Sequence, residues 1–131
     1  MACRICISNY KDLLKKIAIF DDDENILSIC AYILEEKGWQ VHTFTNCTLI
    51  TERIKELMPS VILMDNRIPD EGGVIATQKL KNDPSIAAIP VIYFSANSDI
   101  RDLAAEAQAD SFLAKPFDLQ ELEATIDSVI K

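Results

Sequence analysis

The sequence predicts a doubly wound α/β fold with a five-stranded parallel sheet and five helices. Short apolar runs of strand length alternate with segments whose apolar residues recur at helical spacing, from Lys16 onward. Strict alternation of this kind implies a parallel sheet with helices on both faces, joined by right-handed crossovers. The 131 residues fit one domain with a sizeable core.

Each strand is predicted from an apolar run. The first, at residues 17–20, is apolar on both faces and is therefore expected to lie buried between two helical layers. Residues 39–44 are more polar and are expected at an edge of the sheet. The other strands are expected at 61–64, 91–94 and 111–114.

The helices follow from spacing and from their end signals. The first is expected over 25–37, ending at Gly38, with these side chains on its inward face: Ile26, Ile29, Cys30, Ile33 and Leu34. Asn46 is expected to start the next helix and Pro59 to end it. Further helices are expected over 72–81 and 99–107, and a last one behind the N-cap Asp118.

Composition excludes several classes of protein. The net charge is −8, whereas a nucleic-acid-binding surface needs a basic face, so no direct nucleic-acid partner is expected. The longest apolar runs have strand length, so no membrane-spanning segment is expected. The N-terminus shows no secretory signal pattern, and the expected location is the cytoplasm.

Residues 1–14 are expected to form a loosely held extension that precedes the domain at 15–131. They carry Cys3 and Cys6 at CxxC spacing. A zinc site needs about four ligands and the chain has a single histidine, so a metal or redox role for this pair is not expected. Cys30 and Cys47 are expected in helices, as small core residues.

Polar side chains follow four of the predicted strands. Asp21 and Asp22 follow the first strand, Asp65 the third, Ser95 the fourth and Lys115 the fifth. The carboxyl ends of the strands form the ligand crevice of an open α/β sheet. Clustered carboxylates suit Mg²⁺, and they repel one another unless a cation or Lys115 compensates their charge. The sequence therefore predicts a cation and phosphoryl site at this edge.

Other acidic motifs fit less well. Asp21 to Glu24 could simply cap the next helix, since acids favour a helix N-terminus, but that does not explain the full set. A calcium loop would need Gly and Glu where the chain has Ile26 and Tyr32, and is rejected. A haloacid-dehalogenase-type phosphatase also places D-x-D after its first strand. Its motif continues to Thr or Val where the chain has Asn25, so it remains the runner-up.

Four pieces of the chain together resemble the receiver domain of two-component response regulators. They are KKIAIFDDDENIL, PSVILMDNRIPDEGG, IPVIYFSA and ADSFLAKPF, and they stand in the right order at the right strand ends. The resemblance runs over residues 15–131. It implies a flavodoxin-like sheet with strand order 2-1-3-4-5, and a phosphorylation-driven signalling function rather than that of a metabolic enzyme.

The resemblance also assigns roles to the strand-end residues. Asp65 would be the phosphoacceptor, taking the phosphoryl group from the phosphohistidine of a histidine kinase or a phosphotransfer protein. Asp21, Asp22, Asp65 and the backbone carbonyl of Arg67 would hold the cofactor Mg²⁺. Lys115 would pair with a phosphoryl oxygen. The domain would assist its own phosphorylation and dephosphorylation.

A conformational switch is implied in the same way. Ser95 would move toward the acyl phosphate and Phe112 would turn inward, changing the face of the fourth helix, fifth strand and fifth helix that meets a downstream protein. Ser95 could instead satisfy backbone groups at a strand end, and Phe112 could be ordinary core. The bond between Lys115 and Pro116 is expected to be cis, as is usual in the family.

Two departures from the family pattern stand out. Gln108 occupies a position where the family often has Gly, and Arg67 is long and basic two residues after the phosphoacceptor. We expect Arg67 to slow self-dephosphorylation, and an Arg67→Ala variant with an unchanged phosphoryl lifetime would contradict this. A receiver module of a hybrid kinase and a pseudo-receiver used only for protein contacts stay open as alternatives.

Overall fold

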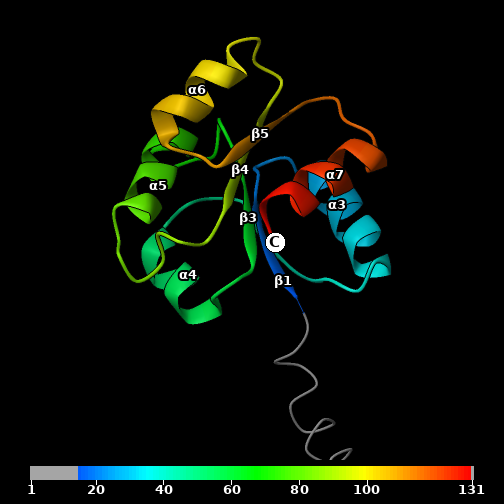
Figure 1. Cartoon of the computed structure of the whole chain (residues 1–131), viewed down its shortest axis with the longest axis horizontal. Coiled ribbons are helices and arrows are strands. Elements are labelled where there is room, and N and C mark those ends of the chain that lie inside the picture. Colours follow the sequence, from blue (N-terminus) through cyan, green and yellow to red (C-terminus); the bar gives the residue numbers. More distant parts are fainter. Residues whose placement is uncertain (1–14, 131) are drawn as a thin grey trace, which may run out of the picture.

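The computed structural model describes residues 15–130 (Figure 1). The expected extension at residues 1–14, with Cys3 and Cys6, lies outside the described residues. Within 15–130 the chain forms a parallel sheet of order β2-β1-β3-β4-β5, as predicted. The strands are β1 (Lys16–Phe20), β2 (Gln40–Phe44), β3 (Val61–Asp65), β4 (Val91–Ser95) and β5 (Ser111–Ala114).

Two helical layers cover the sheet. The helices are α3 (Glu24–Glu36), α4 (Ile50–Leu57), α5 (Gly72–Lys81), α6 (Ile100–Ala107) and α7 (Leu119–Val129). Figure 1 shows α3 and α7 on one side of the strands and α4, α5 and α6 on the other. Successive strand residues point to opposite faces, so Ala18 packs into the α4–α6 layer while Ile17 and Ile19 pack into the α3–α7 layer. None of the described helices is long and apolar enough to cross a membrane.

The strand register brings the carboxyl ends of the strands to one edge. Phe20 pairs with Met64, and Asp65 pairs with Phe94. Ser95 pairs with Ala114, the residue before Lys115. The loops that begin at the ends of β1, β3, β4 and β5 therefore start side by side.

Local end signals explain where several helices begin. Asp23 accepts the backbone N–H groups of Asn25 and Ile26 at the start of α3. Asp118 and Glu121 form a reciprocal capping box at the start of α7, which confirms the predicted N-cap.

The predicted helix start at Asn46 is wrong. The Asn46 side chain accepts the N–H of Thr48 in a turn, and α4 begins only at Ile50. Cys47 is buried but lies before the helix, where its N–H and its thiol both point to the carbonyl of Pro69. This contact between distant segments holds the chain out of helical geometry.

The predicted inward face of α3 is partly wrong. Cys30 and Leu34 are buried as expected, and Leu27 joins them. Ile29 is 58% exposed. The face that packs on the sheet is therefore rotated by a fraction of a turn from the predicted one, which leaves Ile29 on the surface.

Candidate functional site

Three carboxylates meet at the carboxyl edge of the sheet. Asp21, Asp22 and Asp65 each offer an oxygen, and these oxygens lie within 4.8 Å of one another. Asp21 is 1% exposed and is fixed by its own backbone, because its N–H donates to the carbonyl of Phe44 at 3.0 Å. Asp22 is exposed and faces solvent. The donor set is all oxygen and partly open to water, which fits Mg²⁺.

Lys115 joins two of these carboxylates. Its Nζ lies 2.7 Å from Asp21 Oδ2 and 2.8 Å from Asp65 Oδ1, and 4.4 Å from the centre of the Phe94 ring. The bond to Pro116 is cis, as predicted. The ammonium therefore comes from the end of β5 to the point where the carboxylates converge.

The electrostatics of the cluster follow from burial. Burial raises the pKa of Asp21 because it penalises the charged form, and the negative charge of Asp65 adds to the rise, whereas hydrogen bonds from Lys115 and the Asp23 N–H oppose it. Burial alone would lower the pKa of Lys115, but hydrogen bonds to Asp21 and Asp65 raise it. The lysine stays charged, and it pairs with two of the three acids, Asp21 and Asp65.

The turn after β3 holds the carboxylate of Asp65. Its Oδ2 accepts the N–H of Arg67 at 3.0 Å, while Lys115 occupies its Oδ1. The carbonyl of Asn66 accepts the N–H of Gly73 at 3.0 Å, which ties the turn to the start of α5. Both oxygens of Asp65 are thus oriented by named donors.

These residues border a single open cavity of about 550 Å³. It brings together every strand-end residue that the sequence singled out, and the following residues line it: Asp21, Asp22, Asp23, Asp65, Arg67, Ser95, Ala96, Asn97 and Lys115. An acidic crevice with one fixed lysine can bind a divalent cation and an anionic group together.

A model of the response regulator receiver domain family matches residues 17–127. The chain belongs to this family. Receiver domains generally bind Mg²⁺ at an acidic pocket, and the three carboxylates supply such a pocket here.

Two curated relatives are regulators of transcription. The chain is 28% identical over 123 residues to the phosphate regulon transcriptional regulatory protein PhoB of Rhizobium meliloti, covering 91% of this chain and 53% of that protein. It is 29% identical over 120 residues to the DNA-binding dual master transcriptional regulator RpaA of Synechocystis, covering 90% of this chain and 50% of that protein. The chain spans about half the length of these curated relatives.

Solved receiver structures resemble this one closely. The signal receiver domain of a signal transduction histidine kinase from Syntrophus aciditrophicus superposes with a TM-score of 0.81 at 28% identity, covering 88% of this chain and 89% of that one. A response regulator receiver domain protein from Clostridium thermocellum gives 0.78 at 26% identity, covering 89% and 94%. Receivers of both kinds of protein therefore share this architecture.

The two residues predicted to form the switch differ in burial and have different contacts. Ser95 is buried beside the cavity, and its Oγ accepts the N–H of Asn97 at 3.0 Å. Phe112 is 37% exposed and carries the guanidinium of Arg101 over its ring, 5.5 Å from the centre. The alternative that Phe112 is ordinary core is therefore wrong.

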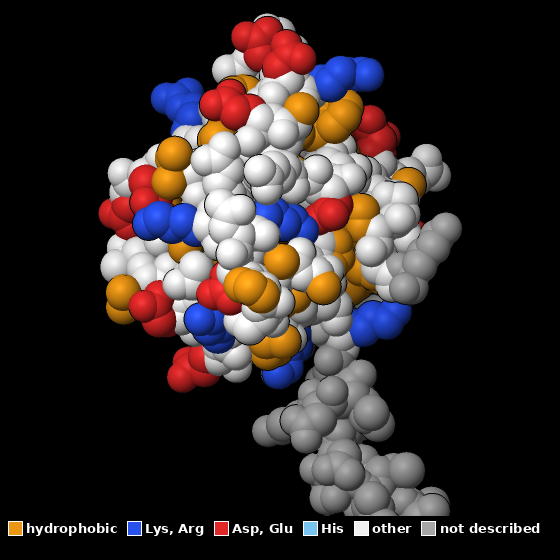
Figure 2. All heavy atoms as spheres, turned by 60° about the vertical axis from the view of Figure 1, so that its left-hand side comes forward, with side chains coloured by type: hydrophobic (Ala, Val, Ile, Leu, Met, Phe, Trp, Pro, Cys, Tyr) orange, Lys and Arg blue, Asp and Glu red, His pale blue; other side chains and the backbone are white. Residues whose placement is uncertain are grey.

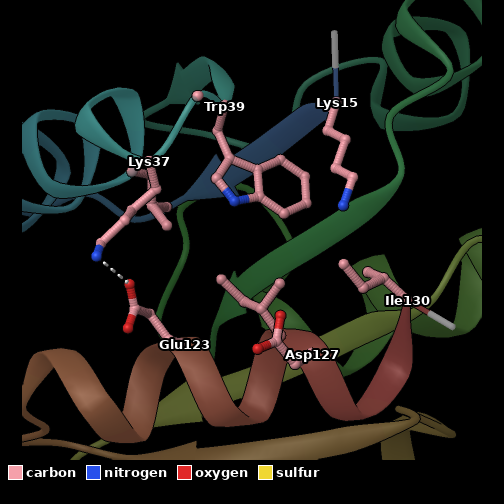
Figure 3. A pocket seen from close by; sticks show the side chains of 9 residues that line it. Lys15, Lys37, Trp39, Glu123, Asp127 and Ile130 are labelled. Carbon is pink, nitrogen blue, oxygen red and sulfur yellow. Dashed lines mark ion pairs between the residues drawn. The ribbon is translucent and has the colours of Figure 1, made fainter. Parts of the chain in front are cut away.

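A second hollow lies at the opposite edge of the sheet, where the strands begin (Figure 3). Its volume is about 460 Å³, and Lys15, Trp39 and Ile130 are among the residues that line it. The ion pair of Lys37 with Glu123 spans it at 3.2 Å. The acids that line it, Glu123 and Asp127, lie on α7, and Asp65 is not among its lining residues within 15–130.

The roles of three residues at the phosphoacceptor turn were not predicted from the sequence. Asn66 lies in this turn, and Gly73 in α5 and Tyr93 in β4 donate hydrogen bonds to it. Only Tyr93 carried a usable signal, because a buried phenol in an apolar strand needs a hydrogen-bond partner.

Proposed function

We propose that this receiver domain accepts a phosphoryl group on Asp65 from a histidine kinase or a phosphotransfer protein, and signals by a change of its surface. The observation that carries the proposal is the convergence of three carboxylates and Lys115 at one edge of the sheet. A cytoplasmic location and assistance of its own dephosphorylation belong to the same proposal.

The chemistry needs little more than these groups. A carboxylate oxygen of Asp65 attacks the phosphorus, the bond between phosphorus and the donor's imidazole nitrogen breaks, and its electron pair stays on that nitrogen. Positioning and charge neutralisation dominate such a transfer. Asp21, Asp22 and Asp65, with the carbonyl of Arg67, would hold Mg²⁺, which when bound offsets the charge of the phosphoryl group.

Lys115 is placed to follow the reaction. It touches the carboxylate of Asp65 now, and it would pair with a phosphoryl oxygen after the transfer. Ser95 would supply a second donor. Its Oγ already accepts the N–H of Asn97, so its hydroxyl hydrogen is free to donate to the acyl phosphate.

The readout would be a change at Phe112, which moves from its exposed position toward the space near Ser95. This alters the α6–β5–α7 face, which is the surface expected to meet a downstream protein. Figure 2 brings the α4–α6 side forward and shows acidic and basic side chains interspersed there. A Ser95→Ala variant that keeps the full phosphorylation-dependent change would contradict this coupling.

A surface beside the site fits the donor protein. Ile26, Ile29 and Phe117 line an open hollow of about 460 Å³ that also includes Lys115. The exposed Ile29 offers apolar contact area, and exposed apolar patches often mark protein contacts. A partner that covered it would have its phosphohistidine close to Asp65.

The test is an intact-mass assay with acetyl phosphate and Mg²⁺ on the wild type and Asp65→Asn. We expect one phosphoryl group on the wild type and none on the variant or without Mg²⁺. Steady release of phosphate without an adduct would favour the haloacid-dehalogenase-type phosphatase. With neither adduct nor donor consumption, and none after incubation with phosphorylated kinase, the pseudo-receiver would take first place.

A receiver module of a hybrid kinase shares this chemistry. The likeness to the receiver of a histidine kinase, at 28% identity, keeps that alternative open. It differs in what lies next to the domain in the full protein, not in the site.

A further inference from the structure

Tyr93 brings a polar group into a mostly apolar part of the core. It lies in β4, whose residues are all buried, and its own exposure is 0%. A buried hydroxyl costs free energy unless it is hydrogen-bonded. Its partner is Asn66, the residue directly after Asp65: the Tyr93 hydroxyl donates to Asn66 Oδ1.

Strand register explains how this bond reaches the site. Tyr93 pairs with Met64, and both pack in the layer beneath α4, α5 and α6. The phenol extends from that layer to the turn two residues beyond Met64. Asp65 and Asn66 are therefore held from different strands, Asp65 by Lys115 after β5 and Asn66 by Tyr93 in β4.

Asn66 is a sensitive point at which to hold the turn. Its carbonyl accepts the N–H of Gly73 at 3.0 Å, and the next N–H, that of Arg67, donates to Asp65 Oδ2 at 3.0 Å. The bond from Tyr93 restrains the Asn66 side chain in addition to these backbone contacts. The peptide between Asn66 and Arg67 is then fixed as well, and this peptide directs a hydrogen bond at the Asp65 carboxylate.

The phenol is a permanent donor. Burial raises the pKa of Tyr93 far above its usual range, and the negative charges of Asp65 and Glu106 add to the rise. The hydroxyl therefore stays protonated, and able to donate, at neutral pH.

We propose that Tyr93 is a positioning residue for the phosphoacceptor, which acts through Asn66 to orient the carboxylate of Asp65 and the Arg67 peptide. The proposal rests on the proposed function of Asp65 and names a further residue that serves the same site. Phe would fill the same space in β4, so the hydroxyl group, and not the ring, carries this role.

The experiment compares Tyr93→Phe, Asn66→Ala and the double variant with the wild type. Thr77→Val is the matched control. Thr77 in α5 is also fully buried in the layer that covers this face, and its hydroxyl has no hydrogen-bond partner among residues 15–130. Both Tyr93→Phe and Thr77→Val remove one buried hydroxyl and keep the shape of the side chain.

The first readout is the rate of phosphorylation by acetyl phosphate at saturating Mg²⁺. We expect Tyr93→Phe to be slower by about twofold to tenfold, the change that corresponds to one hydrogen bond. Asn66→Ala should be slowed to a similar extent, and the double variant no more than either single one. Thr77→Val should keep the wild-type rate. A wild-type rate in Tyr93→Phe, or effects that multiply in the double variant, would overturn the proposal.

The second readout does not depend on phosphorylation. Amide exchange of Arg67 and Gly73, measured by NMR, should be faster in Tyr93→Phe and unchanged in Thr77→Val. Equal exchange in the wild type and Tyr93→Phe would overturn the positioning role. If the wild type gains no phosphoryl group but these amides respond as expected, the function proposed for Asp65 fails and the role of Tyr93 in holding the turn stands.

Discussion

Gly73 touches the phosphoacceptor strand at the level of the backbone, and Gly73→Ala is the sharpest test of the site's geometry. A Cβ added at Gly73 would lie 2.4 Å from the carbonyl oxygen of Asp65 and 3.0 Å from the Cα of Asn66. Real Cβ atoms essentially never come closer than 3.0 Å to another heavy atom. The start of α5 and the end of β3 would have to separate by at least about 0.6 Å.

The cost can be estimated from opposing effects. Alanine favours a helix over glycine by about 1 kcal/mol. Overpacking of a filled interior costs about 1–3 kcal/mol, and weakening the bond from the Gly73 N–H to the Asn66 carbonyl costs about 1 kcal/mol more. We expect a net loss of about 1–3 kcal/mol in the free energy of unfolding. A misplacement of about 1 Å can slow a reaction roughly 100-fold, so phosphorylation of Asp65 should fall by about tenfold or more.

Gly72→Ala is the matched control at the neighbouring position. Gly72 has φ +86°, so alanine there costs about 1–2 kcal/mol, but its Cβ would lie at an ordinary 3.7 Å from the Asn66 carbonyl oxygen. The assay combines urea unfolding with the rate of phosphorylation by acetyl phosphate at saturating Mg²⁺. Both variants should have a lower free energy of unfolding than the wild type, but only Gly73→Ala should be phosphorylated more slowly. Equal slowing of both, or a wild-type rate in Gly73→Ala, would refute the reasoning.

Three further variants, one of them with a matched control, test the electrostatics and the backbone. Asp21→Asn should raise the free energy of unfolding at pH 7 by about 0.5–2 kcal/mol. Burial raises the pKa of Asp21, so protonation of this carboxyl stabilises the folded wild type at low pH, and this stabilisation is lost as pH rises through the pKa of Asp21 in the folded state. The difference in the free energy of unfolding between Asp21→Asn and the wild type, measured by urea titration, should therefore shrink toward pH 4. Mg²⁺ at ten times its Kd should stabilise the wild type by about 1.4 kcal/mol and this variant by less. Gln108→Gly should raise the free energy of unfolding by about 0.5–1 kcal/mol, because Gln108 has φ +67°; a lower Tm would contradict this. Lys81→Met should lower the free energy of unfolding by about 1–3 kcal/mol, since Lys81 Nζ donates to two backbone carbonyls and lies 2.6 Å from Asp110 Oδ2. The control Lys79→Met removes an exposed ion pair and should lower it by less than about 0.5 kcal/mol in the same urea unfolding assay.

Local patterns predicted the sheet because a strand that is buried on both faces is a continuous apolar run in the sequence. The run at residues 17–20 could pack only between two layers, and the polar residues that follow four of the runs marked the crevice. The start of α4 could not be predicted in the same way. Asn46 carries a valid cap signal, but the contact of Cys47 with Pro69, 22 residues further on, overrides it.

The charged residues of the site could be predicted from the sequence, but the contacts that hold the turn after β3 could not. Asp21, Asp65 and Lys115 were found because each follows a strand. The roles of Gly73 and of the bond between Tyr93 and Asn66 depend on how closely α5 and β4 approach the turn after β3. That distance is set by the packing of three elements, and no spacing in the sequence encodes it.

The exposed position of Phe112 bears on how a single phosphoryl group could switch the surface. Full burial of a Phe side chain is favourable by about 1.5–3 kcal/mol, and Phe112 is already more than half buried, so turning inward gains only about 1 kcal/mol. The contact with Arg101 that it gives up is worth about 0.5–1 kcal/mol at an exposed site. The two positions are therefore nearly balanced in free energy. A hydrogen bond from Ser95 to a charged phosphoryl oxygen is worth about 1.5–3 kcal/mol, which shifts such an equilibrium by about tenfold to a hundredfold. In our proposal the switch needs no large rearrangement of the core, because one new bond is enough to decide between two arrangements of similar stability.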